Sequence, residues 1–484
     1  MKISIIGTGY VGLVSGACFS DLGNEVLCVD KNKNKIDMLN KKQIPIYEPG
    51  LKELINKNFI AGRLKFTTNL SNAVKKSDII FICVGTPASK KGNSANLKQV
   101  FDVAKQIGKN INKFKIIVNK STVPITTGDM VEKIISKKSK RKLFEVVSNP
   151  EFLREGEAIR DFRFPDRIVV GLNNKKVFKK IKNLYEPLIK KGAKFFTTNR
   201  RGAELVKYAS NAFLATKITF INELANLCEK TGIDVEDISI GMGMDQRIGG
   251  RFLRAGPAYG GSCFPKDTKA ITYTGDRFNV NLSVIKSVIK SNQERKSLLT
   301  KRIKKILSNK IKNKKISFLG VTFKPNTDDM RESSSLIMMP FLNKLGSKIR
   351  YYDPSGEKKE FKHLKNVKFC KNIKMACYDS DLVIIHTEWE EFKAINFSKI
   401  LNKKNAKIYD LRNLYSPNLI KNKGFKYYSI GRWVFYFISN MASISTAAPK
   451  GKEFVLTAAL ACLPEFPNKF EIISEAGLIT LGWS

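Results

Sequence analysis

A cysteine in a glycine-rich turn is the first feature of this sequence that could do chemistry. The residues YGGSCFPKD occupy positions 259–267, and the proline stands where it would start a helix. A helix amino terminus and a neighbouring lysine lower the pKa of a thiol, so Cys263 would be a nucleophile at neutral pH. A lone cysteine is more often buried packing, but the glycines before Cys263 and the pair Lys266 and Asp267 after it favour the nucleophile.

A second glycine motif, GTGYVG at residues 7–12, follows an apolar run and opens a predicted helix. This context predicts a dinucleotide-binding turn, in which Gly7 makes the tight turn, Gly9 admits the pyrophosphate and Gly12 allows close helix packing. Asp30 ends the next apolar run, where it suits a ribose hydroxyl pair and would repel a 2′-phosphate. NAD is therefore favoured over NADP, although three nearby lysines weaken the preference, and a glycine turn without a ligand is the alternative.

Two further pairs of polar residues recur at one-turn spacing. Lys207 and Asn211 would share one helix face, where an ammonium and an amide could stabilise a developing alkoxide. Glu151 and Glu155 lie in NPEFLREG (149–156), where they could hold a water molecule or contact a nicotinamide ribose. The alternatives stay open: a solvated face for the first pair and helix-start charges for the second.

The composition is that of a folded protein with a large positive charge. The 484 residues are 43% hydrophobic and 27% charged, which excludes disordered, collagen-like and coiled-coil chains and predicts two or three domains. The formal net charge is +43, but the lysines are scattered, without an arginine-rich tract or an aromatic ladder. We interpret the charge as a solvated surface rather than a nucleic-acid footprint, and its field would help to recruit an anionic substrate.

The cysteines and the amino terminus bear on metal binding and location. The eight cysteines form no C-x-x-C pair, and His363 and His386 are the only histidines, so no metal site is expected. The amino terminus KISIIGTGYVGL is typical of a first strand rather than a signal peptide. We expect free thiols in a reducing cytoplasm and no stable membrane insertion.

The elements that would position these residues are visible in the hydrophobic pattern. Short apolar runs alternate with amphipathic stretches up to about residue 200. The alternation predicts a parallel sheet covered by helices on both faces. The expected strands are KISIIG, EVLCVD, SDIIFICVG, KIIVNKS, FEVVSNP and RIVVGL. Residues 203–230 then predict one long helix, apolar on more than one face and stopped by Gly232, which would join two domains and pack against a second subunit.

A second series of strands begins at KKISFLG (314–320) and continues with SKIRYYDP, SDLVIIHT and AKIYDLRN. Residues 77–87 and 380–389 occupy similar places in the two series. The predicted fold is therefore α/β, with two doubly wound, Rossmann-like parallel-sheet domains joined by a long central helix. Residues 433–484 break the pattern, and their apolar run is too short and too interrupted for a membrane span. A membrane-associated or partner-binding tail and an incidental extension both stay open.

Seven motifs, in this order, resemble the UDP-glucose/GDP-mannose dehydrogenase family over about residues 1–432. They are GTGYVG (7–12), VGTP (84–87), KSTVP (120–124), NPEFLREG (149–156), KYASNAF (207–213), FLRAGPAYGGSCFPKD (252–267) and GVTFKPNTDDMRESS (320–334). PDRIVVG (165–171) and the segment 247–261 look more like the UDP-glucose branch than the GDP-mannose branch.

The resemblance implies a division of the chain into functional domains. The implied parts are an NAD-binding Rossmann domain at 1–200, a central helical dimerisation domain with the cysteine loop at 201–305, a UDP-sugar-binding Rossmann-like domain at 306–432, and an atypical tail at 433–484. The implied partners are a UDP-sugar and a second copy of the chain, with no nucleic acid.

The resemblance also implies a reaction, the double oxidation of UDP-glucose to UDP-glucuronate with two NAD in turn. Cys263 would hold the intermediate aldehyde as a thiohemiacetal while the cofactor is exchanged, and the thioester formed next would be hydrolysed. The remaining roles carried over are oxyanion stabilisation by Lys207 and Asn211, ordering of water and proton transfer by Asp267 and Thr122, and assistance of hydrolysis by Glu151. The identity of the general base stays open.

Ligand contacts carry over to the matching positions of this chain. The cofactor contacts are Gly7, Gly9, Tyr10, Val11, Gly12, Asp30, Lys35, Thr86, Thr122, Glu155, Lys266 and Arg331. The substrate contacts are Glu151, Phe152, Leu153, Arg154, Glu155, Lys207, Asn211, Arg247, Phe252, Leu253, Arg254, Ala255, Gly256, Gly260, Lys324 and Arg412. Arg247 resembles an arginine that reaches into a neighbouring subunit's site.

Two departures from the family pattern stand out. The loop at 88–97 lacks the acidic residue often found after its glycine, and the tail after Arg432 matches nothing in the family. Two other functions stay open: the same chemistry on GDP-mannose or another nucleotide sugar, and a basic nucleic-acid or membrane-surface protein with an idle dinucleotide fold. The intact set of Cys263, Lys207, Asn211 and Asp267 argues against the last.

Overall fold

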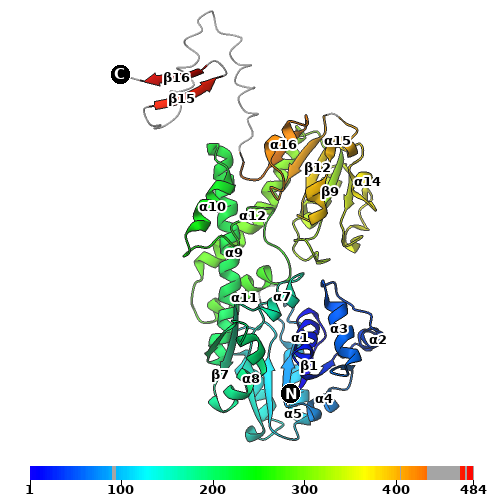
Figure 1. The fold of residues 1–484 in the computed structure, drawn as a ribbon, viewed down its shortest axis with the longest axis vertical. Coiled ribbons are helices and arrows are strands. Elements are labelled where there is room, and N and C mark those ends of the chain that lie inside the picture. Colours follow the sequence, from blue (N-terminus) through cyan, green and yellow to red (C-terminus); the bar gives the residue numbers. More distant parts are fainter. Residues whose placement is uncertain (90–93, 404, 433–468, 475–476, 483–484) are drawn as a thin grey trace, which may run out of the picture. The chain divides into compact units, whose positions relative to one another are not determined.

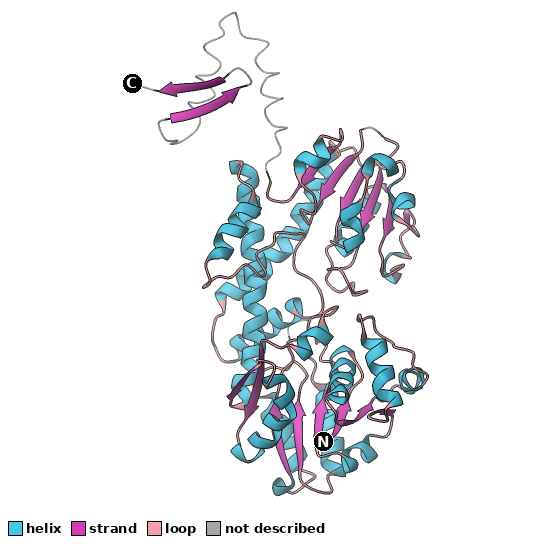
Figure 2. Cartoon of the chain, viewed as in Figure 1, coloured by secondary structure: helices cyan, strands magenta, loops and turns pink. Residues whose placement is uncertain are grey.

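The computed structural model describes residues 1–89, 94–403, 405–432, 469–474 and 477–482. It divides the chain into two compact units, Met1–Arg432 and Trp433–Ser484. Within the first unit two largely parallel sheets with helices on both faces confirm the predicted fold class (Figures 1 and 2). We call the part from β1 to β8 the first half and the part from β9 to β14 the second half.

The sheet of the first half has the strand order β3-β2-β1-β4-β5-β6-β7-β8. Its strands are β1 (Lys2–Ile6), β2 (Glu25–Val29), β3 (Leu64–Thr67), β4 (Ile79–Ile82), β5 (Lys115–Asn119), β6 (Phe144–Ser148), β7 (Arg167–Leu172) and β8 (Lys194–Thr198). The expectation of a purely parallel sheet is wrong at one place, since β7 runs antiparallel to β6. The chain between these strands contains only the short helix α7 (Ala158–Arg163), so it does not make the full helical crossover that a parallel pair needs.

The sheet of the second half has the order β11-β10-β9-β12-β13-β14, and all its pairs are parallel. Its strands are β9 (Lys315–Leu319), β10 (Lys348–Tyr352), β11 (Val367–Phe369), β12 (Leu382–Ile385), β13 (Lys407–Asp410) and β14 (Lys426–Ser429). In both halves the strand order reverses beside the first strand, which creates the crevice where doubly wound sheets bind ligands.

Helices cover both sheets and connect them. The remaining helices of the first half are α1 (Tyr10–Asp21), α2 (Lys33–Asn40), α3 (Leu51–Ile60), α4 (Leu70–Lys76), α5 (Lys98–Asn110), α6 (Thr127–Ser136) and α8 (Phe178–Ile189). Those of the connection are α9 (Arg200–Thr231), α10 (Val235–Met244), α11 (Phe264–Arg277) and α12 (Ser283–Ile306), and those of the second half are α13 (Ser335–Lys344), α14 (Ile373–Cys377), α15 (Phe397–Ile400) and α16 (Pro417–Lys421).

Helix α9 confirms the predicted long helix and joins the two halves (Figure 1). Its first turn is capped by the Asn199 side chain, which accepts from the Gly202 amide at 2.7 Å, and it ends at Gly232 with φ 78°. Near its start it packs closely on β7, and towards its end Ile221 and Ala225 join the core of the second half.

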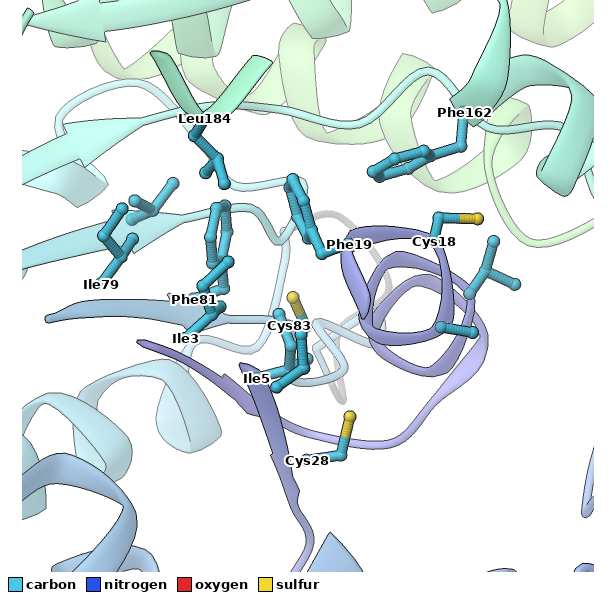
Figure 3. Packing of buried hydrophobic residues seen from close by; sticks show 14 of the residues in the cluster. Ile3, Ile5, Cys18, Phe19, Cys28, Ile79, Phe81, Cys83, Phe162 and Leu184 are labelled. Carbon is cyan, nitrogen blue, oxygen red and sulfur yellow. The ribbon is translucent and has the colours of Figure 1, made fainter. Parts of the chain in front are cut away.

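One hydrophobic core of the first half packs α1 against the sheet (Figure 3). Ile3 and Ile5 of β1, Phe81 of β4 and Phe19 of α1 are fully buried there, and the rings of Phe19 and Phe81 lie 5.0 Å apart between centroids. Each such side chain contributes about 1.5–3 kcal/mol of burial, so the turn after β1 rests on a stable base.

The second unit is described only in part. Its described residues form an antiparallel hairpin of β15 (Lys469–Ser474) and β16 (Gly477–Gly482). The suggested membrane-associated or partner-binding run at 433–448 lies outside the described residues, as does the middle of the 88–97 loop. No helix among the described segments combines the length and the apolar character that crossing a bilayer requires.

Candidate active site

The turn after β1 has the geometry of a dinucleotide cradle. Gly7 has φ 103°, a conformation that favours glycine, and a Cβ at Gly12 would collide with the carbonyl oxygen of Gly7. No described atom lies within 4 Å of where a Cβ of Gly9 would be, so the start of α1 at Tyr10 and Val11 is open to a phosphate group. The amide groups of this helix end have no side-chain cap, and a dinucleotide pyrophosphate fits them.

Asp30 stands at the end of β2, beside this turn. Its Oδ2 accepts from the Thr8 amide at 3.0 Å and the Thr8 hydroxyl at 2.8 Å, and Lys35 Nζ lies 3.7 Å away. Partial burial raises the pKa of Asp30, but the hydrogen bonds from the Asn32 and Thr8 amides lower it overall, so the carboxylate stays ionised. Its placement fits the predicted ribose contact.

Cys263 is the N-cap residue of α11 and is half-buried. Two buried residues of α9, Lys207 and Asn211, are fixed near it by carboxylates. Lys207 Nζ lies 3.3 Å from Glu151 Oε1, and Asn211 Nδ2 donates to Asp267 Oδ2 at 2.6 Å. The charges of Glu151, Lys207 and Asp267 all act on the Cys263 thiol, so these residues form one cluster.

The electrostatics of this cluster correct one expectation. Burial raises the pKa of the Cys263 thiol, Glu151 and Asp267 raise it further, and Lys207 only partly opposes them. The expected thiolate at neutral pH is therefore wrong for the protein without ligands, because the sulfur is removed from water and faces two carboxylates. Burial lowers the pKa of Lys207, but Glu151 and the groups beside it raise it overall, so its ammonium stays charged.

Lys266 extends the cluster, and Thr122 joins two loops of the first half. Lys266 Nζ lies 2.6 Å from Asp267 Oδ1, so Asp267 is held from both sides by Lys266 and Asn211. Thr122 follows β5, and its carbonyl accepts from the Thr86 hydroxyl at 2.9 Å, which ties the loops after β4 and β5 together. Phe152 lies under two cations, with its ring centroid 5.1 Å from Lys207 Nζ and 4.2 Å from the guanidinium of Arg167.

The glycines before Cys263 are required by the second half. A Cβ at Gly260 would lie 2.7 Å from the Glu332 carbonyl oxygen, and one at Gly261 would lie 2.7 Å from the ring of Phe323. The Gly261 amide also donates to the Arg331 carbonyl at 2.8 Å. The segment that follows β9 therefore packs directly on the turn that carries Cys263.

Glu155, Lys324 and Arg331 meet in the same region. Arg331 forms a two-bond pair with Asp329, at 2.7 Å for both contacts, and its Nη2 lies 3.3 Å from Glu155 Oε1. Burial and the nearby Asp329 carboxylate raise the pKa of Glu155, while burial lowers the pKa of Lys324. These are the predicted contacts from the two halves, and the structure brings them together.

Three predicted arginines bind protein groups instead. Arg154 is paired with Asp161 at 2.6 Å, and Arg247 is 89% exposed and paired with Asp245, outside this cluster. Arg412 Nε donates to the His386 carbonyl at 2.9 Å and Nη2 to the Phe323 carbonyl at 2.8 Å, although its Nη1 lies close to Gly256. In the predicted substrate segment, Leu253 and Ala255 are buried and Arg254 is exposed.

Glu48 is a site residue that the sequence motifs did not indicate. Its Oε2 accepts from the Gly156 amide at 2.7 Å and from the Tyr10 hydroxyl, and its Oε1 accepts from the Ala158 amide at 2.8 Å. It caps α7 from a distant loop and so positions the preceding segment, which contains Leu153 and Glu155. Asn222, Asn292 and Arg295 were missed as well, since a polar helix face is usually solvated.

Among the described residues no three His, Cys, Asp or Glu side chains are grouped as a metal site.

Comparisons with known proteins agree over the first unit. Models of the UDP-glucose/GDP-mannose dehydrogenase family match its NAD binding domain to residues 1–189, its central domain to 201–294 and its UDP binding domain to 317–417. The chain is 45% identical to a UDP-glucose 6-dehydrogenase of Rhizobium meliloti over 89% of this chain and 100% of that protein. It is 44% identical to the UDP-glucose 6-dehydrogenase TuaD of Bacillus subtilis over 89% of this chain and 93% of that protein. A solved UDP-glucose dehydrogenase from Pyrobaculum islandicum has a TM-score of 0.82 at 33% identity, covering 89% of this chain and 98% of that one.

Proposed function

Because the chain belongs to the UDP-glucose/GDP-mannose dehydrogenase family and is an NAD-dependent oxidoreductase, we propose that it oxidises UDP-glucose to UDP-glucuronate in two steps. The observation that carries this proposal is the placement of Cys263 beside charged Lys207, between a dinucleotide cradle and a UDP-binding half. NAD, when bound, accepts a hydride from the sixth carbon of the sugar in each step.

In the first step the sugar loses a hydride and its hydroxyl proton, and negative charge develops on the sixth oxygen. The Lys207 ammonium and the Asn211 amide stabilise this charge, because both are buried and held in place by Glu151 and Asp267. Their positions are fixed before the substrate arrives, so little reorganisation is needed.

In the second step Cys263 forms a bond from its sulfur to the aldehyde carbon. Its thiol proton passes by way of a base of the cluster to the carbonyl oxygen, which becomes the thiohemiacetal hydroxyl. Loss of a second hydride and of the hydroxyl proton leaves a thioester, and water cleaves its carbon–sulfur bond to give the carboxylate and the thiol. Because the Cys263 thiol has a raised pKa, the step needs a base. We assign the movement of the proton and of the water to Asp267, Thr122 and Glu151.

The sugar nucleotide binds between the halves. We assign its contacts to Lys324, to Gly260, to the segment from Phe252 to Gly256 and to the loop from Glu151 to Glu155. Arg412 holds the carbonyls of the surrounding loops and acts on the substrate by orienting them.

We also propose that two copies of the chain pack through α9. Phe213, Phe220 and Leu227 lie seven residues apart on this helix and are 65%, 46% and 57% exposed. Such a stripe is apolar enough to be an interface, and we assign the exposed Arg247 to a contact with the second copy. All described cysteines are free, in keeping with a cytoplasmic enzyme.

The first experiment counts NADH formed per UDP-glucose consumed. Two are expected, and one would mean that the reaction stops at the aldehyde and the proposal is wrong. Rates with UDP-glucose and GDP-mannose are measured side by side, and turnover of GDP-mannose alone would contradict the assigned substrate.

The second experiment replaces the nucleophile. Cys263→Ser should reduce NADH formation by at least about a thousandfold, because a hydroxyl is a far weaker nucleophile at neutral pH, while NAD still binds. Cys370→Ser, at a buried cysteine of the second half, is the matched control and should keep its rate. Near-normal turnover by Cys263→Ser would contradict the covalent route.

A further inference from the structure

The segment from Phe252 to Cys263 links the assigned substrate contacts to the nucleophile, and its backbone is strained. Ala258 has φ 134° and Phe252 has φ 67°, in the part of conformational space that glycine favours. Residues in such conformations persist only where the surrounding structure holds them. The two sides of Ala258 must therefore be fastened to something rigid.

On the amino side of Ala258 the fastening is at Gly256. The Gly256 amide donates to Asn222 Oδ1 at 2.8 Å, and Arg295 Nε donates to the Gly256 carbonyl at 2.7 Å. Arg295 Nη1 also donates to the Asn222 carbonyl at 3.0 Å, which joins α9 to α12 at this point. Both side chains are buried, so water does not compete for these bonds.

On the carboxyl side the fastening is at Tyr259 and comes from one side chain. The Tyr259 amide donates to Asn292 Oδ1 at 2.9 Å, and Asn292 Nδ2 donates to the Tyr259 carbonyl at 3.1 Å. Asn292 is 6% exposed and pairs with this peptide as a neighbouring strand would. Cys263 follows four residues later, with Gly260 and Gly261 between them already packed on the second half.

We propose that Asn292 is a positioning residue for Cys263: it holds the strained segment at Tyr259 and so fixes where the backbone enters α11. Asn222 and Arg295 supply the opposite anchor. The expected effect on turnover rests on the proposed function, whereas the expected effect on the reactivity of the Cys263 thiol does not.

The first test is Asn292→Ala. With its carboxyl-side anchor removed, Ala258 can relax, and the Cys263 sulfur moves away from its working position. We expect kcat with UDP-glucose to fall by about tenfold to a hundredfold, because a displacement of about 1 Å has effects of this size. KM should change less, since Gly256 keeps both of its bonds.

The second test is rescue by relieving the strain. Glycine adopts φ 134° without cost. Adding Ala258→Gly to the Asn292→Ala protein should therefore raise kcat at least about tenfold above that of Asn292→Ala alone. A role in general stability alone would not respond in this way. The matched control is Thr300→Val, at a buried residue of α12 whose hydroxyl bonds only the Lys296 carbonyl, and it should keep the wild-type kcat.

A third readout uses no sugar nucleotide. The rate of Cys263 alkylation by iodoacetamide, followed by mass spectrometry of its peptide, should change several-fold in Asn292→Ala and return in the double variant. If UDP-glucose is not a substrate, this readout still tests the positioning role. If Asn292→Ala is poorly folded, Asn292→Asp keeps the size and the acceptor but loses the donor, and the same loss and rescue are expected. Wild-type kcat and alkylation rate in either folded variant, or a loss that Ala258→Gly does not restore, would overturn the proposal.

Discussion

The two halves of the first unit are built alike around their first strands. In the first half the Ser4 hydroxyl of β1 binds the Ala73 carbonyl and the Ser77 hydroxyl, and in the second half the Ser317 hydroxyl of β9 binds the corresponding groups of Ala376 and Ser380. Both first strands end in a glycine with positive φ, 103° at Gly7 and 73° at Gly320. The shared scaffold makes the differences that follow informative.

The first difference is the state of the carboxylate after the second strand. Asp30 is partly open and holds Thr8, whereas Asp353 is fully buried and paired with Lys358, which is itself buried. A ribose could reach Asp30 but not Asp353. The turn of the second half is therefore a structural element without an open carboxylate for a ribose.

The second difference is the chain after the glycine. Helix α1 begins at Tyr10, directly behind Gly9, and presents its amide groups to a phosphate. In the second half α13 begins only at Ser335, and the intervening segment packs on Gly260 and Gly261. The first half is the NAD-binding half, and the second half packs a long loop on the turn before Cys263.

The largest effect expected from this comparison is on stability, at Asp353. Asp353→Ala leaves Lys358 buried without its carboxylate and removes the acceptor of the Val321 amide, so the free energy of unfolding should fall by about 3–5 kcal/mol. Urea denaturation followed by circular dichroism measures this. Asp30→Ala is the matched control and should lose far less. Equal urea midpoints for the two variants would contradict the structural difference described between Asp353 and Asp30.

The next effect concerns Glu204, a buried carboxyl group where α9 meets the first half. Unlike Asp353, it has no lysine or arginine among its hydrogen-bond and ion-pair partners in the part of the chain that the structure describes. Glu204 of α9 accepts from the Gly128 amide at 2.7 Å and the Ser148 hydroxyl at 3.0 Å, and burial, despite these bonds, raises its pKa to about 7. The folded protein thus keeps a proton that the unfolded chain releases near pH 4.5. Its contribution to stability is complete below that pH and is lost as the pH rises through about 7.

Comparison with Glu204→Gln isolates this contribution. The stability of the wild-type protein relative to Glu204→Gln should fall by about 3 kcal/mol between pH 4.5 and pH 7.5, since each unit of pKa shift corresponds to about 1.4 kcal/mol. Urea denaturation at a series of pH values is the measurement. A constant difference across this range would mean that Glu204 is ionised throughout.

The smallest effect is on cofactor binding at Asp30. Asp30→Ala should raise the KM for NAD by about tenfold to a hundredfold, equivalent to about 1.4–2.8 kcal/mol, and leave the KM for UDP-glucose unchanged. It should also narrow the difference in KM between NAD and NADP, because the repelling carboxylate is gone. An unaltered KM for NAD would show that the two halves do not differ in the way described.

Much of the fold could be predicted because its central strands are continuous apolar runs. The strands that sequence reasoning missed are β3, β8, β11 and β14, and each of them forms an edge of its sheet. Edge strands such as LKFT and KYYS are short and carry lysine and other polar residues on their open side, so they lack the signal of a buried strand. The antiparallel direction of β7 was missed because direction depends on the connection, which the strand residues do not encode.

The candidate site could be predicted where chemistry demands particular residue types. Cys263, Lys207, Asn211 and Asp267 meet as expected, and the glycines of the first turn have the expected geometry. Glu48 and Asn292 could not be found, because their function depends on main-chain groups brought near by folding. The thiol pKa was misjudged for the same reason: the helix terminus and the lysine are local in sequence, but the burial of the sulfur is not.

The carboxylate of Glu48 attaches the loop after β6 to the cofactor-binding turn of the first half. Since it ties Gly156 and Ala158 to the tyrosine of the first turn, any separation of the halves that lets a nucleotide in or out would carry Glu151 and Glu155 away with the cofactor side. Such a separation would break the 3.3 Å contact between Glu155 and Arg331 and the close packing of Gly156 against Asn326. An entering sugar nucleotide would thus meet a divided pocket, and the acids would reach it only on closure.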